Sequence, residues 1–204
     1  YHIFLNQQRS LQYQQFHIHL KISCCTPSRP LVYIGKLQQL QTLDLTDAQM
    51  EALPDSIGGL IRLQRLLLGR NRINKLPNSI TELQALNQLD ISENYFQKLP
   101  EKIGFLRNLE RLDFGGNNLK EIPDEVCNAL FLNFIVGSHN QLNLLPEKIG
   151  DLRALSDLHL ANNRLEALPQ SFSQLEKLRW LDLSHNKFAT LPLQIENLKA
   201  LEVL

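Results

Sequence analysis

One spacing dominates this sequence: a leucine-like residue recurs every 23 positions, seven times in succession and without an insertion. These anchor residues are Leu43, Leu66, Leu89, Leu112, Ile135, Leu158 and Leu181. A second, usually apolar anchor follows two residues later, and an Asn follows three residues after that in every unit except the first, which has Ala48. A fixed period of this length is the signature of a solenoid built from stacked coils.

Each part of the repeating unit predicts a local structure. The alternation of the two anchors predicts a short strand with one buried face. The Asn is expected to hydrogen-bond backbone groups where the chain turns away from the strand. A Leu-Pro step such as Leu76-Pro77 suits the first turn of a short helical segment on the opposite side of the coil. The residues that follow at spacings of three, as in Ile57, Leu60 and Leu63, are expected to fill the coil.

The period also predicts how the chain is divided. Residues 1–19 are predicted to be an N-terminal tail or an irregular cap, and 20–42 a degenerate first repeat with Cys25 at the Asn position. Residues 43–203 form seven repeats of 23 residues, and position 204 begins a truncated further repeat. Neither end has a recognisable polar cap of the kind that solenoids need, which favours a fragment of a longer protein.

Composition narrows the function classes. Lys plus Arg and Asp plus Glu are equal at 21 each, so no basic footprint for nucleic acid is present. Three cysteines cannot build a disulfide framework, and the sequence contains no Asn-x-Ser/Thr acceptor, which weighs against secretion. No apolar run approaches the length that crosses a bilayer. We therefore expect neither a nucleic-acid partner nor a membrane span.

The unit LxxLxLxxNxLxxLPxxIGxLxx, clear in LQRLLLGRNRINKLPNSITELQA, resembles the leucine-rich repeats of intracellular scaffolds. It is similar to the repeats of the suppressor-of-Clear Ras-pathway scaffold, of Scribble and Erbin, and of plant Ras-group repeat proteins, and similar units occur in some bacterial proteins. The resemblance covers residues 20–204. It implies an α/β horseshoe with a parallel sheet on its concave face, short helical or irregular segments on its convex face, and a partner on the concave face. The suppressor-of-Clear type further implies a cytoplasmic location, peripheral to membranes through its partners, and a Ras-family GTPase or a protein phosphatase as partner.

With the anchors inside, the side chains between them are expected on the concave face. The predicted partner-binding residues are Arg65, Leu67, Asp90, Arg111, Asp113, Phe134, Val136, His159, Trp180 and Asp182. Exposed aromatic and Arg side chains are common interface anchors, so we expect Trp180, Phe134 and Arg111 to share a site. The alternative is that these are the scattered surface apolar groups that any protein carries.

The fifth repeat leaves one question of strand register open. Gly137 occupies an anchor position, so the core is expected to be thin there. Phe134 or Val136 could turn inward through a register change to fill it. Because a register slip reverses the facing of a whole strand, the intact frame around this repeat favours the exposed arrangement.

Charges on the predicted face have two interpretations. Asp90 and Asp113 are expected to be lateral neighbours, with Arg65 and Arg111 diagonal to them. They form either an acidic patch that recognises a basic partner segment or a solvated ladder partly balanced by the arginines. Because exposed ion pairs contribute little energy, we favour the second interpretation.

Catalysis and metal binding find little support in the sequence. His159 beside Asp157 and Asp182 lacks a third ligand at suitable spacing, and Ser138 near His159 lacks an evident oxyanion donor. Neither a phosphate-binding Gly loop nor a zinc-finger pattern is present. We therefore expect no enzymatic activity, no cofactor and no metal.

The sequence thus predicts a protein-interaction scaffold that binds its partner on the concave face, in intracellular small-GTPase or MAP kinase signalling. One alternative is the recognition ectodomain of a receptor. Another is the regulatory or substrate-binding arm of a larger enzyme such as a kinase or a ubiquitin ligase.

Overall fold

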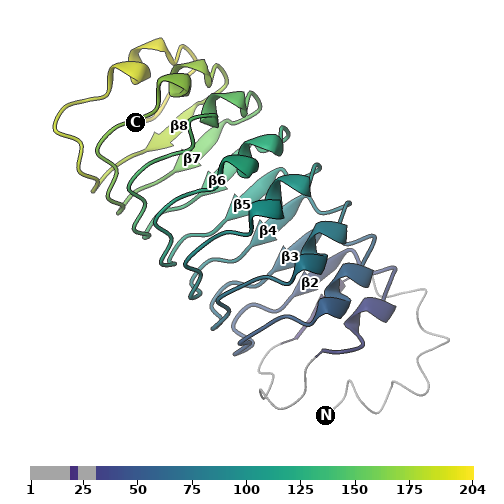
Figure 1. Ribbon diagram of the computed structural model, residues 1–204. Helices are drawn as coiled ribbons and strands as arrows, with labels where there is room; N and C mark the ends of the chain where they lie inside the picture. The colour runs from purple at the N-terminus through teal and green to yellow at the C-terminus, as the bar shows by residue number, and fades with distance from the viewer. Residues whose placement is uncertain (1–18, 23–30) are drawn as a thin grey trace.

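The computed structural model describes residues 19–22 and 31–204. Within them the chain forms a solenoid whose strands join one parallel sheet in sequence order (Figure 1). The strands are β1 His19–Lys21, β2 Thr42–Asp44, β3 Arg65–Leu67, β4 Gln88–Asp90, β5 Arg111–Asp113, β6 Phe134–Val136, β7 Asp157–His159 and β8 Trp180–Asp182. Equivalent residues of successive repeats pair with each other. The predicted leucine-rich-repeat solenoid with a parallel sheet is confirmed.

Short 3-10 helices line the other side of the coils (Figure 1). They are η2 Ile34–Lys36, η3 Asp55–Gly59, η4 Asn78–Glu82, η5 Glu101–Phe105, η6 Asp124–Asn128, η7 Ile149–Asp151, η8 Gln170–Gln174 and η9 Leu193–Asn197. A proline from the Leu-Pro step directly precedes most of them, as Pro77 precedes η4, because the first helical turn needs no N–H from it. Strands lie only about 4.8 Å apart, whereas helices are bulkier, so the sheet becomes the concave face.

The core is one continuous column of apolar side chains from Ile22 to Leu198. The strand anchors Leu43, Leu66 and Leu89 are fully buried. Inward-facing residues that follow each Leu-Pro step are buried as well, as at Ile57 and Leu60. Since each coil covers the apolar surface of the next, stacking completes what no single repeat can bury.

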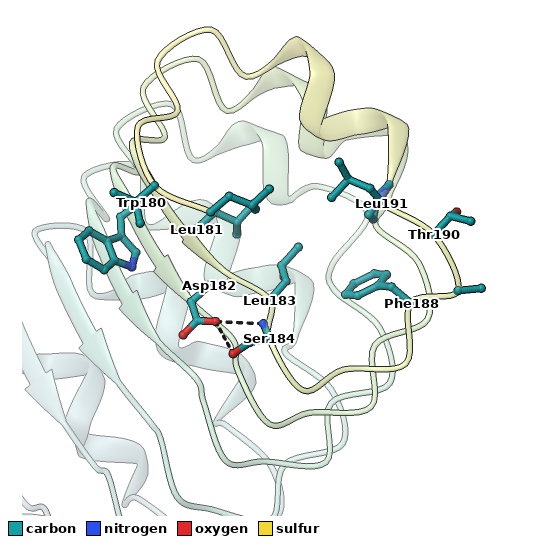
Figure 2. Close-up of a pocket in the computed structure, with 12 residues that line it drawn as sticks. Trp180, Leu181, Asp182, Leu183, Ser184, Phe188, Thr190 and Leu191 are labelled. Carbon is teal, nitrogen blue, oxygen red and sulfur yellow. Dashed lines mark hydrogen bonds between the residues drawn. The ribbon is translucent and has the colours of Figure 1, made fainter.

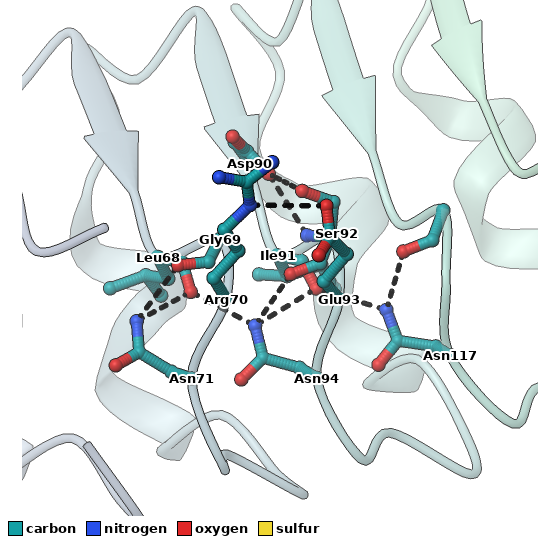
Figure 3. Close-up of polar contacts among 11 residues, drawn as sticks. Leu68, Gly69, Arg70, Asn71, Asp90, Ile91, Ser92, Glu93, Asn94 and Asn117 are labelled. Carbon is teal, nitrogen blue, oxygen red and sulfur yellow. Dashed lines mark hydrogen bonds and ion pairs between the residues drawn. The ribbon is translucent and has the colours of Figure 1, made fainter. Parts of the chain in front are cut away.

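The repeated Asn forms a ladder along the turn that follows each strand (Figure 3). Asn94 is buried; its Nδ2 donates to the Leu68 carbonyl of the preceding coil at 2.9 Å, and its Oδ1 accepts from the Ile73 amide at 2.9 Å. The same pair of bonds between coils recurs at Asn71, Asn117, Asn140, Asn163 and Asn186. The predicted backbone role of the Asn is confirmed.

A left-handed backbone residue stands immediately before the Asn position in every one of the seven repeats. Its φ lies between 49° and 66°, at Asp47, Arg70, Glu93, Gly116, His139, Asn162 and His185. This conformation costs an L-residue roughly 1–2 kcal/mol. The Asn bonds and the stacked coils hold the turn closed against that cost.

The strand before Gly137, β6, keeps the regular register, so the register change considered for this repeat does not occur. Phe134 and Val136 keep their places on the outer face, paired in register with Arg111 and Asp113 of β5. The space above Gly137 is filled instead by Phe114, the second anchor of the preceding repeat, which is fully buried. A Cβ atom on Gly137 would collide with the Phe114 ring and lie 3.1 Å from Leu160 Cδ2. The large Phe and the missing side chain therefore compensate each other.

The first repeat is partly described. β1 pairs with β2 in the same register as the later strands, and Ile22, Ile34 and Leu40 join the core. The Cys25 position and all of the predicted tail except His19 lie outside the described residues.

Candidate functional surface

The concave face is built from the outward residues of the three-residue strands. In β2 to β8 the middle residue is buried, and the first and third residues point outward. Side chains therefore form two columns along the sheet. All ten residues predicted to bind a partner stand in these columns, in β3 to β8: Arg65, Leu67, Asp90, Arg111, Asp113, Phe134, Val136, His159, Trp180 and Asp182.

Four of these side chains stack in sequence across β5 to β8, and we call them the aromatic ladder: Arg111, Phe134, His159 and Trp180. The Arg111 guanidinium carbon lies 3.8 Å from the centre of the Phe134 ring. The ring centres of Phe134 and His159 are 5.5 Å apart, and those of His159 and Trp180 are 5.9 Å apart. Tilted ring pairs and a cation over a ring are favourable geometries, so the four side chains hold one another in place. Trp180 is 44 % exposed and remains open to a partner.

Carboxylates surround the aromatic ladder. Asp157 lies between Phe134 and Trp180 in strand register. Asp182 pairs in register with His159, and Asp113 pairs with Val136. Asp157 was not among the predicted binding residues, although it stands in the same column as Arg111, Phe134 and Trp180. Its position in the column was the signal that could have identified it.

The environments of Asp113 and Asp182 differ. Burial raises the pKa of Asp113 to about 6, and the neighbouring Asp90 adds to the rise, against an opposing hydrogen bond from the Gly115 amide at 2.9 Å. For Asp182, burial is outweighed by hydrogen bonds from the Ser184 hydroxyl and amide and by nearby histidines, so its pKa is lowered. Asp113 therefore titrates just below neutral pH, while Asp182 stays ionised.

The two arginines of the predicted charge ladder, Arg65 and Arg111, make other contacts than direct ion pairs with its aspartates. Arg65 Nε donates to Thr42 Oγ1 at 3.2 Å, and Arg111 stacks on Phe134. Among the residues that the structure describes, neither arginine forms an ion pair with Asp90 or Asp113. The charge of Arg111 nevertheless lowers the pKa of Asp113 against the larger effect of burial. An acidic patch and a ladder partly balanced by the arginines both remain predictions for these charges.

Several of the aspartates also have a structural role that the sequence reasoning missed. Asp90 Oδ1 accepts from the Ser92 amide at 2.9 Å and from its hydroxyl at 2.7 Å. Asp44 and Asp182 accept in the same way from the residue two positions on. The Asp-x-Ser/Thr spacing was the signal, since short polar side chains close turns on nearby amides. These bonds end the strand and fix the carboxylates on the concave face.

A second surface lies at the C-terminal end of the stack (Figure 2). A cavity of about 700 Å³ opens there among Leu181, Leu183, Phe188 and Leu191, with Trp180 at its edge. The positions equivalent to Leu183 and Phe188 are covered in earlier repeats by the following coil, as at the fully buried Leu160 and Phe96. The cavity therefore lies at the C-terminal edge of the described coils, next to the ladder.

The described residues show little that could support covalent or metal chemistry. No group of three or more His, Cys, Asp or Glu side chains in residues 19–22 and 31–204 is placed to hold a metal ion. Burial raises the pKa of the Cys127 thiol to about 12, so the reactive thiolate is scarce at neutral pH. Across the same residues, every helix is too short and too polar to pass through a bilayer.

Solved structures of leucine-rich-repeat proteins are similar to this chain. A leucine-rich-repeat protein of Leptospira interrogans is 35 % identical, with a TM-score of 0.81 over 89 % of this chain and 45 % of its own. The TDR receptor is 31 % identical, with a TM-score of 0.83 over 93 % of this chain and 34 % of its own. The Arabidopsis receptor kinase HAESA, solved with the peptide hormone IDA and the co-receptor SERK1, is 32 % identical, with a TM-score of 0.74 over 85 % of this chain and 30 % of its own. The chain thus spans less than half the length of each.

Two models of protein families match the sequence of this chain. The model of the leucine-rich repeat region matches residues 16–94 and 124–204, and that of a single leucine-rich repeat matches residues 108–129. No curated protein matches the chain in sequence. The chain belongs to the leucine-rich-repeat family, whose solenoids are protein-interaction modules.

Proposed function

We propose that this solenoid binds a protein partner on the C-terminal half of its concave face, over β5 to β8. The observation that carries the proposal is the aromatic ladder: four large side chains from four consecutive strands stack on an open sheet. Trp and Arg dominate the residues that contribute most to protein interfaces. Because the four side chains are already ordered by each other, they lose less conformational entropy when a partner binds them.

The surface beside the ladder favours close approach of a partner. The next column holds only small residues on these repeats: Gly115, Ser138, Ala161 and Ser184. Four strands at about 4.8 Å span roughly 14 Å, and the whole sheet spans about twice that, the scale of a protein epitope. A partner backbone can therefore lie on the small column while its side chains reach the ladder.

Two classes of partner come into question: the repeat motif favours one, and the similarity to a solved receptor structure favours the other. The repeat motif resembles intracellular scaffolds, which favours a cytoplasmic partner such as a Ras-family GTPase or a protein phosphatase in small-GTPase or MAP kinase signalling. The likeness to HAESA, solved with a peptide hormone, favours a secreted peptide and a receptor role. In that case the array is the recognition arm of a larger kinase.

The test is capture of partners by the array and by a ladder variant, Arg111→Glu with Trp180→Ala. The matched control is Phe105→Ala, which removes an exposed aromatic ring from η5 on the opposite side of the solenoid. We expect a partner that the wild type and the control retain and that the ladder variant loses. The loss should then be reproduced by affinity measurement with the purified partner. Equal retention by all three proteins would place the binding surface elsewhere.

A further inference from the structure

A group of basic side chains lies on the flank of the solenoid, where the chain runs from the Asn position to the next Leu-Pro step. It comes from three consecutive coils, in the segments 72–75, 95–98 and 118–121. Backbone hydrogen bonds hold neighbouring segments side by side, as where the Tyr95 amide donates to the Ile73 carbonyl at 2.9 Å. The exposed cations of this group, which we call the basic flank, are Arg72, Lys75, Lys98 and Lys120.

The basic flank has a local excess of positive charge, although the whole chain is balanced at 21 basic and 21 acidic residues. Glu121 is the one carboxylate in the three segments. Lys75 and Lys98 hold equivalent positions in neighbouring coils, so their backbones lie only about 5 Å apart. Across residues 19–22 and 31–204, the ion pairs all form between other side chains. The four cations therefore remain available to a ligand of opposite charge.

A recess of about 430 Å³ is hollowed into the basic flank. Its lining consists of Gln97, Lys98, Asn118, Lys120, Glu121 and Gln141. The three primary amides and the two ammonium groups supply N–H donors to the recess. Tyr95, at the position equivalent to Asn118 one coil earlier, is 56 % exposed. Charged and amide N–H donors around one recess are complementary to a carboxylate group.

We propose that the basic flank binds an acidic segment of a protein, with a carboxylate side chain of that segment in the recess. The surface is separate from the aromatic ladder, so this binding site is additional to the proposed function. Nucleic acid is a poorer match. Single strands bind on successive aromatic rings, and the three segments expose one, Tyr95. Duplexes bind through about 6–10 phosphate contacts, more than four cations on three coils can provide.

The probe is a dye-labelled peptide with four glutamates separated by single serines, and its matched control has glutamine in place of each glutamate. Fluorescence anisotropy measures the binding of both to the wild-type protein. In about 50 mM NaCl the glutamate peptide should bind saturably, and the glutamine peptide at least about 10-fold more weakly. Raising NaCl to about 300 mM should weaken the glutamate peptide and leave the glutamine peptide unchanged.

Variants separate the recess from general electrostatics. Lys98→Glu with Lys120→Glu reverses both lysines of the recess and should weaken the glutamate peptide at least about 10-fold. The matched control, Lys177→Glu with Lys199→Glu, changes the net charge equally on exposed lysines of other coils and should change affinity by less than about 2-fold. The ladder variant is expected to bind the peptide as this control does, because the ladder is a different surface.

Five outcomes would overturn the proposal: no binding of the glutamate peptide, equal binding of the two peptides, equal losses in the two lysine variants, loss of binding in the ladder variant, or tighter binding of an oligouridylate with the same number of charges. The last would identify a nucleic-acid surface instead. The peptide and oligouridylate comparisons use the wild-type protein, so they decide the matter even if a variant does not fold.

Discussion

A single asparagine side chain in each coil satisfies backbone groups of two coils at once. Asn117 is buried, donates to the Ile91 and Phe114 carbonyls at 3.0 Å, and accepts from the Phe96 amide at 2.9 Å. Buried backbone groups without partners are costly. At the scale of the residue, the turn after each strand can be buried because the Asn side-chain amide satisfies its backbone groups.

Asn117→Ala is expected to lower the free energy of unfolding by about 2–3 kcal/mol, because the Phe96 amide and the Ile91 carbonyl lose their buried partner. Urea denaturation measures the change. The control is Asn118→Ala, which removes the adjacent, exposed amide and should change stability by less than about 0.5 kcal/mol. Identical urea midpoints for the two variants would show that the hydrogen bonds of Asn117 make no net contribution to the free energy of unfolding.

Asp113 gives the protein a specific pH dependence. Its pKa is about 6 in the folded chain against an ordinary value of 3.8, so the folded state binds the proton more tightly. This contribution to stability is present below pH 3.8 and is lost as the pH rises towards 6. Asp113→Asn keeps an acceptor for Gly115 and removes the titration. The variant should therefore be more stable than wild type at neutral pH, with the difference shrinking towards pH 4.

Urea denaturation of wild type and Asp113→Asn at several pH values between about 4 and 7 measures that difference. Asp124→Asn, an exposed change on η6, serves as the control and should follow wild type at each pH. A constant gap between Asp113→Asn and wild type over this range would contradict the assignment of the titration to Asp113.

At the scale of the element, two departures from the repeat explain each other. Phe114 is larger than the Leu or Ile found at most equivalent positions, and Gly137, one coil later, has no side chain. The Phe114 ring occupies the space that a Gly137 side chain would take. β6 consequently keeps its register, and Phe134 stays on the concave face for the ladder.

Gly137→Leu alone is expected to destabilise the protein by about 3 kcal/mol, because the new side chain meets the Phe114 ring. Phe114→Leu alone should cost about 1–2 kcal/mol through the space it leaves. The double variant restores the common repeat and should lie closer to wild type than Gly137→Leu does. A double-mutant cycle measured by urea denaturation gives the coupling between the two sites. Additive losses would mean that the two positions do not compensate.

At the scale of the whole molecule, stability is a sum over neighbouring coils. Contacts between elements of the described chain join consecutive strands or consecutive helices only. Within these 204 residues an interior coil is covered on both sides, whereas Leu183 and Phe188 of the coil that follows β8 line the open cavity. The same substitution should therefore cost less at the end of the stack.

Leu68→Ala and Leu183→Ala compare the loss of stability in an interior coil with that at the end of the stack, at equivalent repeat positions. Leu68 is fully buried, so its loss should cost about 2–5 kcal/mol. Leu183 is only partly buried, so its loss should cost about 1 kcal/mol. Thermal or urea denaturation measures both. Equal losses would indicate that the end of the stack is covered in solution, for example by a second copy of the chain.

Most of the architecture could be predicted from the sequence, because a 23-residue period determines which residues face the core and which face outward. The anchors, the Asn bonds and the placement of Trp180 on the concave face follow from that period. The facing of Phe134 was left open by Gly137, and the packing of Phe114 over that glycine decided it. Side-chain contacts between coils do not follow from the period, because they depend on rotamers chosen by neighbours 23 or 46 residues away. Only the tertiary structure placed Arg111 on Phe134 rather than beside a carboxylate, and Phe114 over Gly137. Packing between coils thereby decided which of the exposed residues form one surface.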